Sequence, residues 1–71
     1  MKVWVLEQFG HNGFRTVVHV FDSEQGVIKY MEPYGEVSLA RGVSNGLKEM
    51  IFKLTDFPST SYRATQFEVK P

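Results

Sequence analysis

The feature that most constrains the fold is a pair of alternating segments at the start of the chain, Lys2–Phe9 and Phe14–Phe21. In both segments apolar side chains recur at every second position, which is the period of a β-strand. β-Branched and aromatic residues dominate them, as a pleated surface favours. Because only Gly10–Gly13 separates the two segments, they predict an antiparallel hairpin.

The hairpin has two possible registers. A two-residue turn at the Asn-Gly dipeptide, whose residues both accept positive φ, places Val5 opposite Val20. A four-residue loop places Val5 opposite Val18 and Phe9 opposite Phe14. We prefer the four-residue loop because it matches apolar side chains across the strands. In both registers the same residues share a face.

The two faces of the hairpin differ in character. One is apolar enough to face a core, and it carries Val3, Val5, Phe9, Phe14, Val18 and Val20. The other is mixed, and it carries Trp4, Leu6, Val17, His19 and Phe21, bordered by Lys2 and Arg15. A domain of this size buries only about 60% of the surface of its unfolded chain. We therefore expect the mixed face to remain a contact surface, unless a helix at Leu47–Leu54 or a loop covers it.

A short helix is predicted to follow the hairpin. Asp22 or Ser23 is a suitable N-cap, and Gln25 stands three residues after Asp22, as in a capping box. Gly26 weakens this helix, and Pro33 disfavours helical geometry in the residue before it. The helix is therefore expected to be short.

The segment Leu47–Leu54 fits two kinds of secondary structure. Its apolar residues recur at helical spacing, but Met50, Phe52 and Leu54 also alternate as in a strand. We prefer a helix, because Phe52 is then the only misplaced apolar residue. Further along the chain, Tyr62–Val69 predicts a final strand.

These elements predict a single α+β domain over residues 1–71, with a small, mainly antiparallel sheet of three to four strands and one or two helices. The expected core consists largely of Val3, Val5, Phe9, Phe14, Val18, Val20, Val27, Ile28, Met31, Leu47, Met50, Ile51 and Phe67.

Composition argues against several kinds of protein. Eight basic residues balance eight acidic ones and the charges are interspersed, unlike the basic excess of a typical nucleic-acid binder. With no cysteine there is neither a disulfide nor a thiolate metal site. The N-terminus lacks the pattern of a secretion signal, and no apolar run approaches the ~20 residues of a transmembrane helix. We expect a cytoplasmic protein.

No motif for catalysis or metal binding stands out. His11 is placed in the hairpin turn and His19 along a strand, so the two histidines do not predict a metal site. No serine lies in a nucleophile motif, and the glycines form no phosphate-binding loop. We therefore expect no enzymatic activity, no metal and no cofactor.

The mixed face supplies the main candidate contacts. Trp4 and Phe21, with the nearby Arg15 and His19, suit single-stranded nucleic acid, whose bases stack on rings and whose phosphates meet cations. They suit a protein partner as well, because Trp, Tyr and Arg dominate binding hot spots. We prefer a protein partner.

A second cluster of side chains lies in or beside the expected loops, where recognition residues are common. It consists of Tyr34, Arg41, Phe57 and Tyr62. The candidate partner-binding residues of the whole chain are Trp4, Arg15, His19, Phe21, Tyr34 and Arg41.

The opening Val3–Glu7, the strand end Val20–Glu24 and the helix after it resemble a class of short bacteriophage proteins. Those proteins open with a valine-aromatic-valine strand and a hairpin, continue with a helix after a Phe-Ser/Asp-Ser-Glu pattern, and end on a strand. The resemblance covers Met1–Met31 and extends to Tyr62–Val69, whereas Glu32–Phe57 departs from it. It implies an accessory protein that binds a host bacterial protein in the host cytoplasm and modulates or inhibits it. A single-stranded nucleic-acid-binding module and a structural homodimer are the alternatives.

Overall fold

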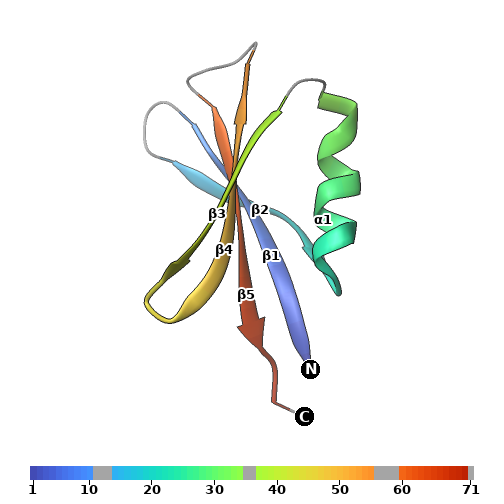
Figure 1. Cartoon of the computed structure of the whole chain (residues 1–71), viewed down its shortest axis with the longest axis vertical. Helices are drawn as coiled ribbons and strands as arrows, with labels where there is room; N and C mark the ends of the chain where they lie inside the picture. Colours follow the sequence, from blue (N-terminus) through green and yellow to red (C-terminus); the bar gives the residue numbers. More distant parts are fainter. Residues whose placement is uncertain (11–13, 35–36, 56–59, 71) are drawn as a thin grey trace.

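The computed structural model describes residues 1–10, 14–34, 37–55 and 60–70. These residues form a five-stranded antiparallel sheet crossed on one side by an α-helix (Figure 1). In chain order the elements are β1 (Lys2–Phe9), β2 (Arg15–Phe21), α1 (Glu24–Met31), the 3-10 turn η1 (Glu32–Tyr34), β3 (Val37–Ser44), β4 (Leu47–Leu54) and β5 (Ser61–Glu68). The strand order is β2-β1-β5-β4-β3. The α+β class and the antiparallel sheet are confirmed, but the predicted number of strands is too small.

The segment Leu47–Leu54 is the strand β4, so the preferred helix is wrong. Asn45-Gly46 joins it to β3, with φ angles of 54° and 79°. Positive φ at both positions is the geometry of a two-residue turn between twisted strands. The turn pairs β3 with β4 along the whole length of both strands. The pairing places Met50, Phe52 and Leu54 on one face, where all three are buried.

Helix α1 begins where the sequence predicts. Ser23 is its N-cap, and the Ser23 Oγ accepts a hydrogen bond from the Gly26 N–H at 3.1 Å. A Cβ atom at Gly26 would lie 3.3 Å from Cδ1 of Phe21, so glycine allows the helix to start close against the end of β2. Val27 and Met31 point from the helix into the core and are buried.

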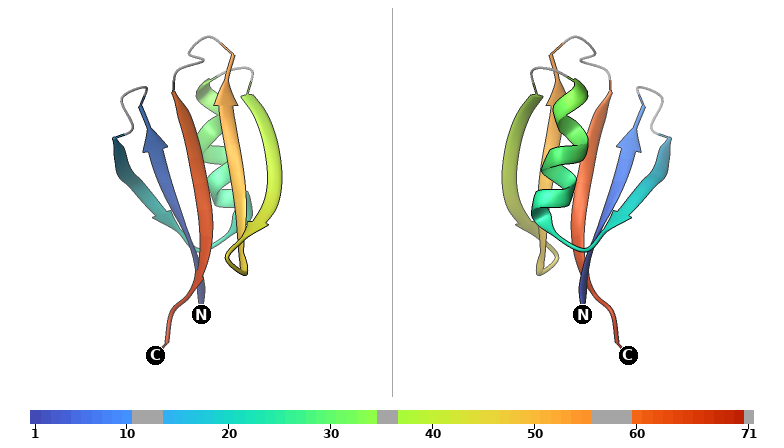
Figure 2. Two further views of the ribbon diagram at one scale, coloured as in Figure 1. Left: turned by 90° about the vertical axis from the view of Figure 1, so that its left-hand side faces the viewer. Right: turned by 90° about the vertical axis from the view of Figure 1, so that its right-hand side faces the viewer.

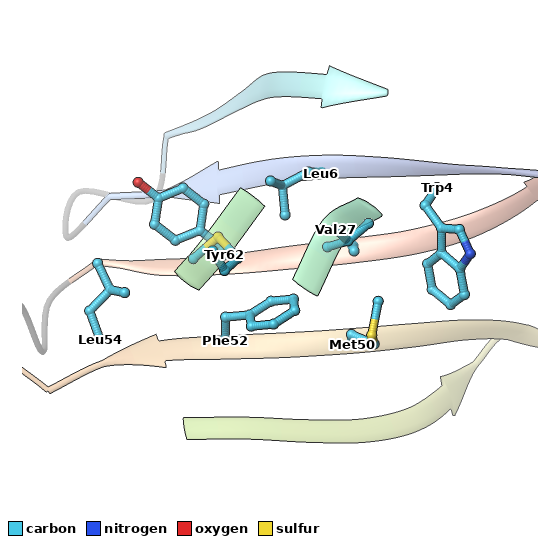
Figure 3. Packing of buried hydrophobic residues seen from close by; sticks show 9 residues of the cluster. Trp4, Leu6, Val27, Met50, Phe52, Leu54 and Tyr62 are labelled. Carbon is cyan, nitrogen blue, oxygen red and sulfur yellow. The ribbon is translucent and has the colours of Figure 1, made fainter. Parts of the chain in front are cut away.

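The hydrophobic core lies between α1 and one face of the sheet (Figures 2 and 3). It consists of Trp4, Leu6, Val27, Met31, Met50, Phe52, Leu54, Tyr62 and Ala64. The covered face is therefore the one that carries Trp4 and Leu6, opposite to the prediction. Since the indole of Trp4 and the isobutyl group of Leu6 offer more apolar surface than two valines, covering this face removes more of that surface from water.

Several residues predicted for the core lie outside it. Phe14, Val20 and Phe67 are 74%, 50% and 40% exposed. Half-buried on the uncovered side of the sheet are Val3, Val5, Phe9, Leu47 and Ile51. The prediction is confirmed for Val27, Met31 and Met50, which are buried, and Val18 and Ile28 pack against the edge of the core.

The observed hairpin register agrees with neither prediction over its whole length. Val5 lies opposite Val20, as the Asn-Gly turn requires, so the preferred four-residue register is wrong. A β-bulge then leaves Val18 out of the pairing and shifts the register by one residue. Beyond the bulge, Phe9 lies opposite Arg15. A bulge breaks the strict alternation on which the division into two faces depends.

Candidate functional site

The sheet face opposite α1 is uncovered, and we call it the open face (Figure 2). The pairing registers place on it Val3, Val5, Glu7 and Phe9 of β1, Arg15, Val17 and Val20 of β2, Glu49 and Ile51 of β4, and Arg63, Thr65 and Phe67 of β5. Because of the bulge, Val17 and Val20 share this face, although strict alternation predicts opposite faces. In the described part of the chain, no segment lies across the open face (Figure 2).

The apolar side chains of the open face extend across three neighbouring strands. Val20 lies opposite Val5, and Val3 lies opposite Phe67. Side chains at directly opposite positions of neighbouring strands contact one another. Val17 is 57% exposed, and Val20 and Phe67 are 50% and 40% exposed. A contiguous exposed apolar patch of this kind is typical of an interaction site.

Four charged side chains of the open face are arranged in two pairs, and a fifth, Lys53 of β4, is exposed on the same face. Arg15 Nε lies 3.8 Å from Glu7 Oε2, and Arg63 Nε lies 3.8 Å from Glu49 Oε2. The two glutamate side chains are only 20% and 15% exposed. The Arg63 guanidinium also lies 5.0 Å from the centre of the Phe9 ring, within the range of a cation–π contact. The open face therefore carries two arginine–glutamate pairs and one further cation, Lys53.

Trp4 is not a surface residue, which corrects the first of the predicted contacts. Its side chain packs in the core on the α1 side of β1 and is 5% exposed (Figure 3). A helix at Leu47–Leu54 or a loop was the expected cover of this face. The cover comes instead from α1, so Trp4 stabilises the fold and is unavailable for contact.

Three other predicted contacts, His19, Phe21 and Tyr34, belong to a row of aromatic rings beside α1. The ring centroids of His19 and Phe21 are 4.7 Å apart, and those rings lie 6.4 and 5.5 Å from Tyr30. Tyr30 lies 6.3 Å from Tyr34, which lies 5.6 Å from Tyr62. We call these five side chains the aromatic row. The ring contacts of the aromatic row pack α1 and η1 against β2 and β5. Its exposed members are His19 and Tyr34.

Two phenols of the aromatic row, those of Tyr30 and Tyr62, have raised pKa values. Burial, followed by the interaction with the Tyr34 hydroxyl, raises the pKa of Tyr62 to about 12. Hydrogen bonding with Tyr34 is the main cause of a raised pKa at Tyr30. The shifts move both pKa values away from neutral pH, near which the pKa of a general base usually lies.

The two predicted arginines lie apart from each other. Arg15 is on the open face, opposite Phe9. Arg41 is on the α1 side of β3, and its Nε and Nη2 donate to Glu24 Oε1 at 3.0 and 2.9 Å. The predicted loop cluster is therefore divided, with Tyr34 in the aromatic row and Arg41 bound to the first turn of α1. Phe57 lies outside the described residues.

The described residues offer little for metal binding or catalysis. No three His, Asp or Glu side chains among them gather closely enough to hold a metal ion, and His11 lies outside them. Three surface cavities formed by described residues have volumes of about 180, 250 and 350 Å³. None of the three is lined by a histidine, serine or threonine. None of the described helical segments has the length and apolar character needed to traverse a lipid bilayer.

Comparison with known proteins gives no relative for this chain. No protein family matches it. No curated protein matches it significantly. No solved structure matches it significantly either.

Sequence reasoning separated the faces of β1 correctly but assigned them the wrong way round. Glu7 is the signal that could have corrected the assignment. It shares a face with Val3, Val5 and Phe9, and a glutamate in the middle of a face is rarely compatible with full burial. The opposite face of the strand, with Trp4, carries no charge between its large apolar residues.

Proposed function

We propose that the protein is a non-catalytic binding domain that contacts another protein through its open face. The observation that carries this proposal is the character of β1. Val3 and Val5 point to one side of it, and Trp4 and Leu6 point to the other. Strands that are apolar on both faces are typical of sheets covered on both sides. Helix α1 covers one side, and a partner would supply the other cover.

The charge pattern favours a protein over a nucleic acid as that partner. Glu7 and Glu49 lie on the open face, each 3.8 Å from an arginine, so two of the three cations on this face already stand beside a carboxylate. Nucleic-acid binding depends on cations that are free to replace the counterions of phosphates. Phe9 could stack on a base, but its ring already lies against the Arg63 guanidinium.

The resemblance of the opening segment to short bacteriophage proteins supports a class of partner. On this proposal the chain acts in the cytoplasm of a bacterial host, where it holds a host protein against the open face and modulates or inhibits it. The apolar side chains on three neighbouring strands of the open face fit binding by apolar contact, and the charges around them would mainly affect association rate and specificity.

A pair of valine substitutions tests the proposal. Val20→Lys introduces a charge into the open face at a position that is already 50% exposed. Val43→Lys is the matched control, because Val43 is 70% exposed on β3 and belongs to the other face of the sheet. The partner is captured from bacterial lysate with the tagged protein, purified, and titrated against each variant. We expect Val43→Lys to bind as the original chain does and Val20→Lys to bind at least about tenfold more weakly.

Equal affinity of the Val20→Lys variant for that partner would contradict the proposal. The same proteins also test the two alternatives. Salt-sensitive binding of a labelled single-stranded oligonucleotide would favour nucleic acid. A dimer detected by analytical ultracentrifugation, and lost only with Val20→Lys, would assign the open face to a second copy of the chain.

A further inference from the structure

The two edges of the sheet differ in regularity. β2 is interrupted by the bulge at Val18, and bulges protect an edge from pairing with another strand. β3, at Val37–Ser44, is paired with β4 along its whole length, and no described strand lies on its other side. In an antiparallel strand, every second residue directs its N–H and C=O away from its neighbour. β3 therefore presents a regular row of free backbone donors and acceptors.

An apolar groove runs beside this edge, between α1 and β3. Its volume is about 180 Å³, and it is lined by Ile28, Met31, Glu32, Val37, Leu39 and Phe52. In Figure 2 the helix lies over the middle of the sheet, and β3 forms the edge beside it. The groove and the free edge of β3 thus lie next to each other on the same side of the molecule.

We propose that β3 accepts an extended segment of another protein as an additional strand, with apolar side chains of that segment in the groove. A strand added to β3 would lie about 4.8 Å from it. Every second side chain of the segment would then point to the α1 side, where Val37 and Leu39 line the groove. In this mode of recognition, backbone hydrogen bonds supply affinity and the pockets for alternate side chains supply specificity.

Glu32 adds a preference for charge. Its exposed carboxylate lines the groove and forms no ion pair with any described residue. Arg41, a cation on this side of β3, is held by Glu24 at 2.9 Å. A lysine or arginine at one end of the incoming segment would complement Glu32. The segment that fits is therefore extended, apolar at alternate positions and basic at one end.

A synthetic peptide tests this inference independently of the open face. The probe is a fluorescein-labelled peptide of eight residues with alternating valine and threonine and a lysine at one end, titrated against the full chain. Binding is followed by fluorescence anisotropy, and the site is mapped by amide shifts in ¹⁵N-labelled protein. We expect the amide signals of β3 and α1 to shift and those of β2 to stay unchanged. The Val20→Lys variant should bind the peptide with the same affinity as the original chain.

A charge exchange sharpens the test. Glu32→Lys should weaken binding of the lysine peptide about fivefold, as expected for an exposed ion pair turned into a repulsion. A peptide ending in glutamate should regain that affinity with Glu32→Lys. Glu68→Lys is the matched control, because Glu68 makes the same charge change at an exposed site away from the groove, and it should leave binding unchanged.

Three results would overturn the inference. The first is no binding of the peptide at millimolar concentration. The second is binding with shifts on the open face or β2 alone. The third is a dimer of the chain that the peptide dissociates, which would assign β3 to a second copy. If the original chain does not bind the peptide but still binds its partner through the open face, the inference about β3 is refuted and the proposed function is not. If the chain binds the peptide but partner binding does not depend on the open face, only the proposed function is refuted.

Discussion

Trp4 is the bulkiest side chain in the hydrophobic core, and it is 5% exposed. An aromatic side chain of this size buries about 150–250 Å², which corresponds to roughly 4–6 kcal/mol of transfer free energy. Val3, its neighbour on the other face, stays half-buried. At the scale of single residues, this difference determines which face of the sheet α1 covers.

Replacing Trp4 should therefore destabilise the chain strongly. We expect Trp4→Ala to lower the free energy of unfolding by about 3–5 kcal/mol, because a large cavity replaces the indole. Val3→Ala on the open face is the control, and its cost should stay near 1 kcal/mol. Urea unfolding followed by circular dichroism measures both. Similar costs for the two substitutions would contradict the assignment of the faces.

Tyr62 should make stability depend on pH in the alkaline range. Its pKa is about 12 in the folded chain, above the value of about 10 expected in the unfolded chain. The folded state therefore favours the protonated phenol, and this contribution is fully present below pH 10 and is lost as the pH rises towards 12. Urea unfolding between pH 8 and 11.5 should show the loss, and Tyr62→Phe should reduce it. An unchanged pH profile in that variant would show that Tyr62 is not the cause.

At the scale of secondary structure elements, the sequence predicted those whose signals are local. β1, β2 and the start of α1 follow from alternation and from the cap at Ser23. β4 was missed because Leu47–Leu54 fits both periods, and only its pairing with β3 and β5 decides between them. The hairpin register was missed because the bulge at Val18 depends on how the whole sheet packs. Neither the pairing of β4 with its neighbours nor the packing of the sheet can be deduced from the sequence of a single segment.

The candidate site was predictable to a similar extent. Of the six predicted contacts, the structure places Arg15 on the open face and moves Trp4 into the core. His19 stays exposed, but in the aromatic row rather than on the open face. The sequence showed that β1 has two apolar faces. It could not show on which of them α1 would lie, because that depends on packing between distant segments.

The cap of α1 gives a test at the scale of this element. The helix has eight residues, too few to be stable alone in water, so the hydrogen bond from the Gly26 N–H to Ser23 Oγ should matter. We expect Ser23→Ala to lower the free energy of unfolding by about 1 kcal/mol. Ser38→Ala, at an exposed position of β3, should change it by less than about 0.5 kcal/mol. Urea unfolding of both variants makes the comparison, and equal effects would show that the cap is dispensable.

At the scale of the whole molecule, the described residues form two layers, the helix α1 and the sheet. A third layer could pack on the open face of the sheet. The chain extends over 39 × 24 × 20 Å, and α1 covers one side of its sheet. Stable domains bury each apolar face of a sheet against another element. Here the described residues supply one such layer. The open face is therefore where an additional layer, supplied by a partner, would gain the most apolar burial.

This arrangement predicts that the open face contributes little to the stability of the isolated chain. Val17→Lys with Val20→Lys should lower the free energy of unfolding by no more than about 1 kcal/mol, since both valines are at least half exposed. Leu6→Ala, on the covered face of β1, should cost about 2–5 kcal/mol. Urea unfolding at two protein concentrations separates the explanations. If the double lysine variant is as unstable as Leu6→Ala, and the original chain is more stable at the higher concentration, a second copy already covers the face. If the double variant keeps its stability at both concentrations, the face is free in the isolated chain, and its apolar side chains are available to a different protein.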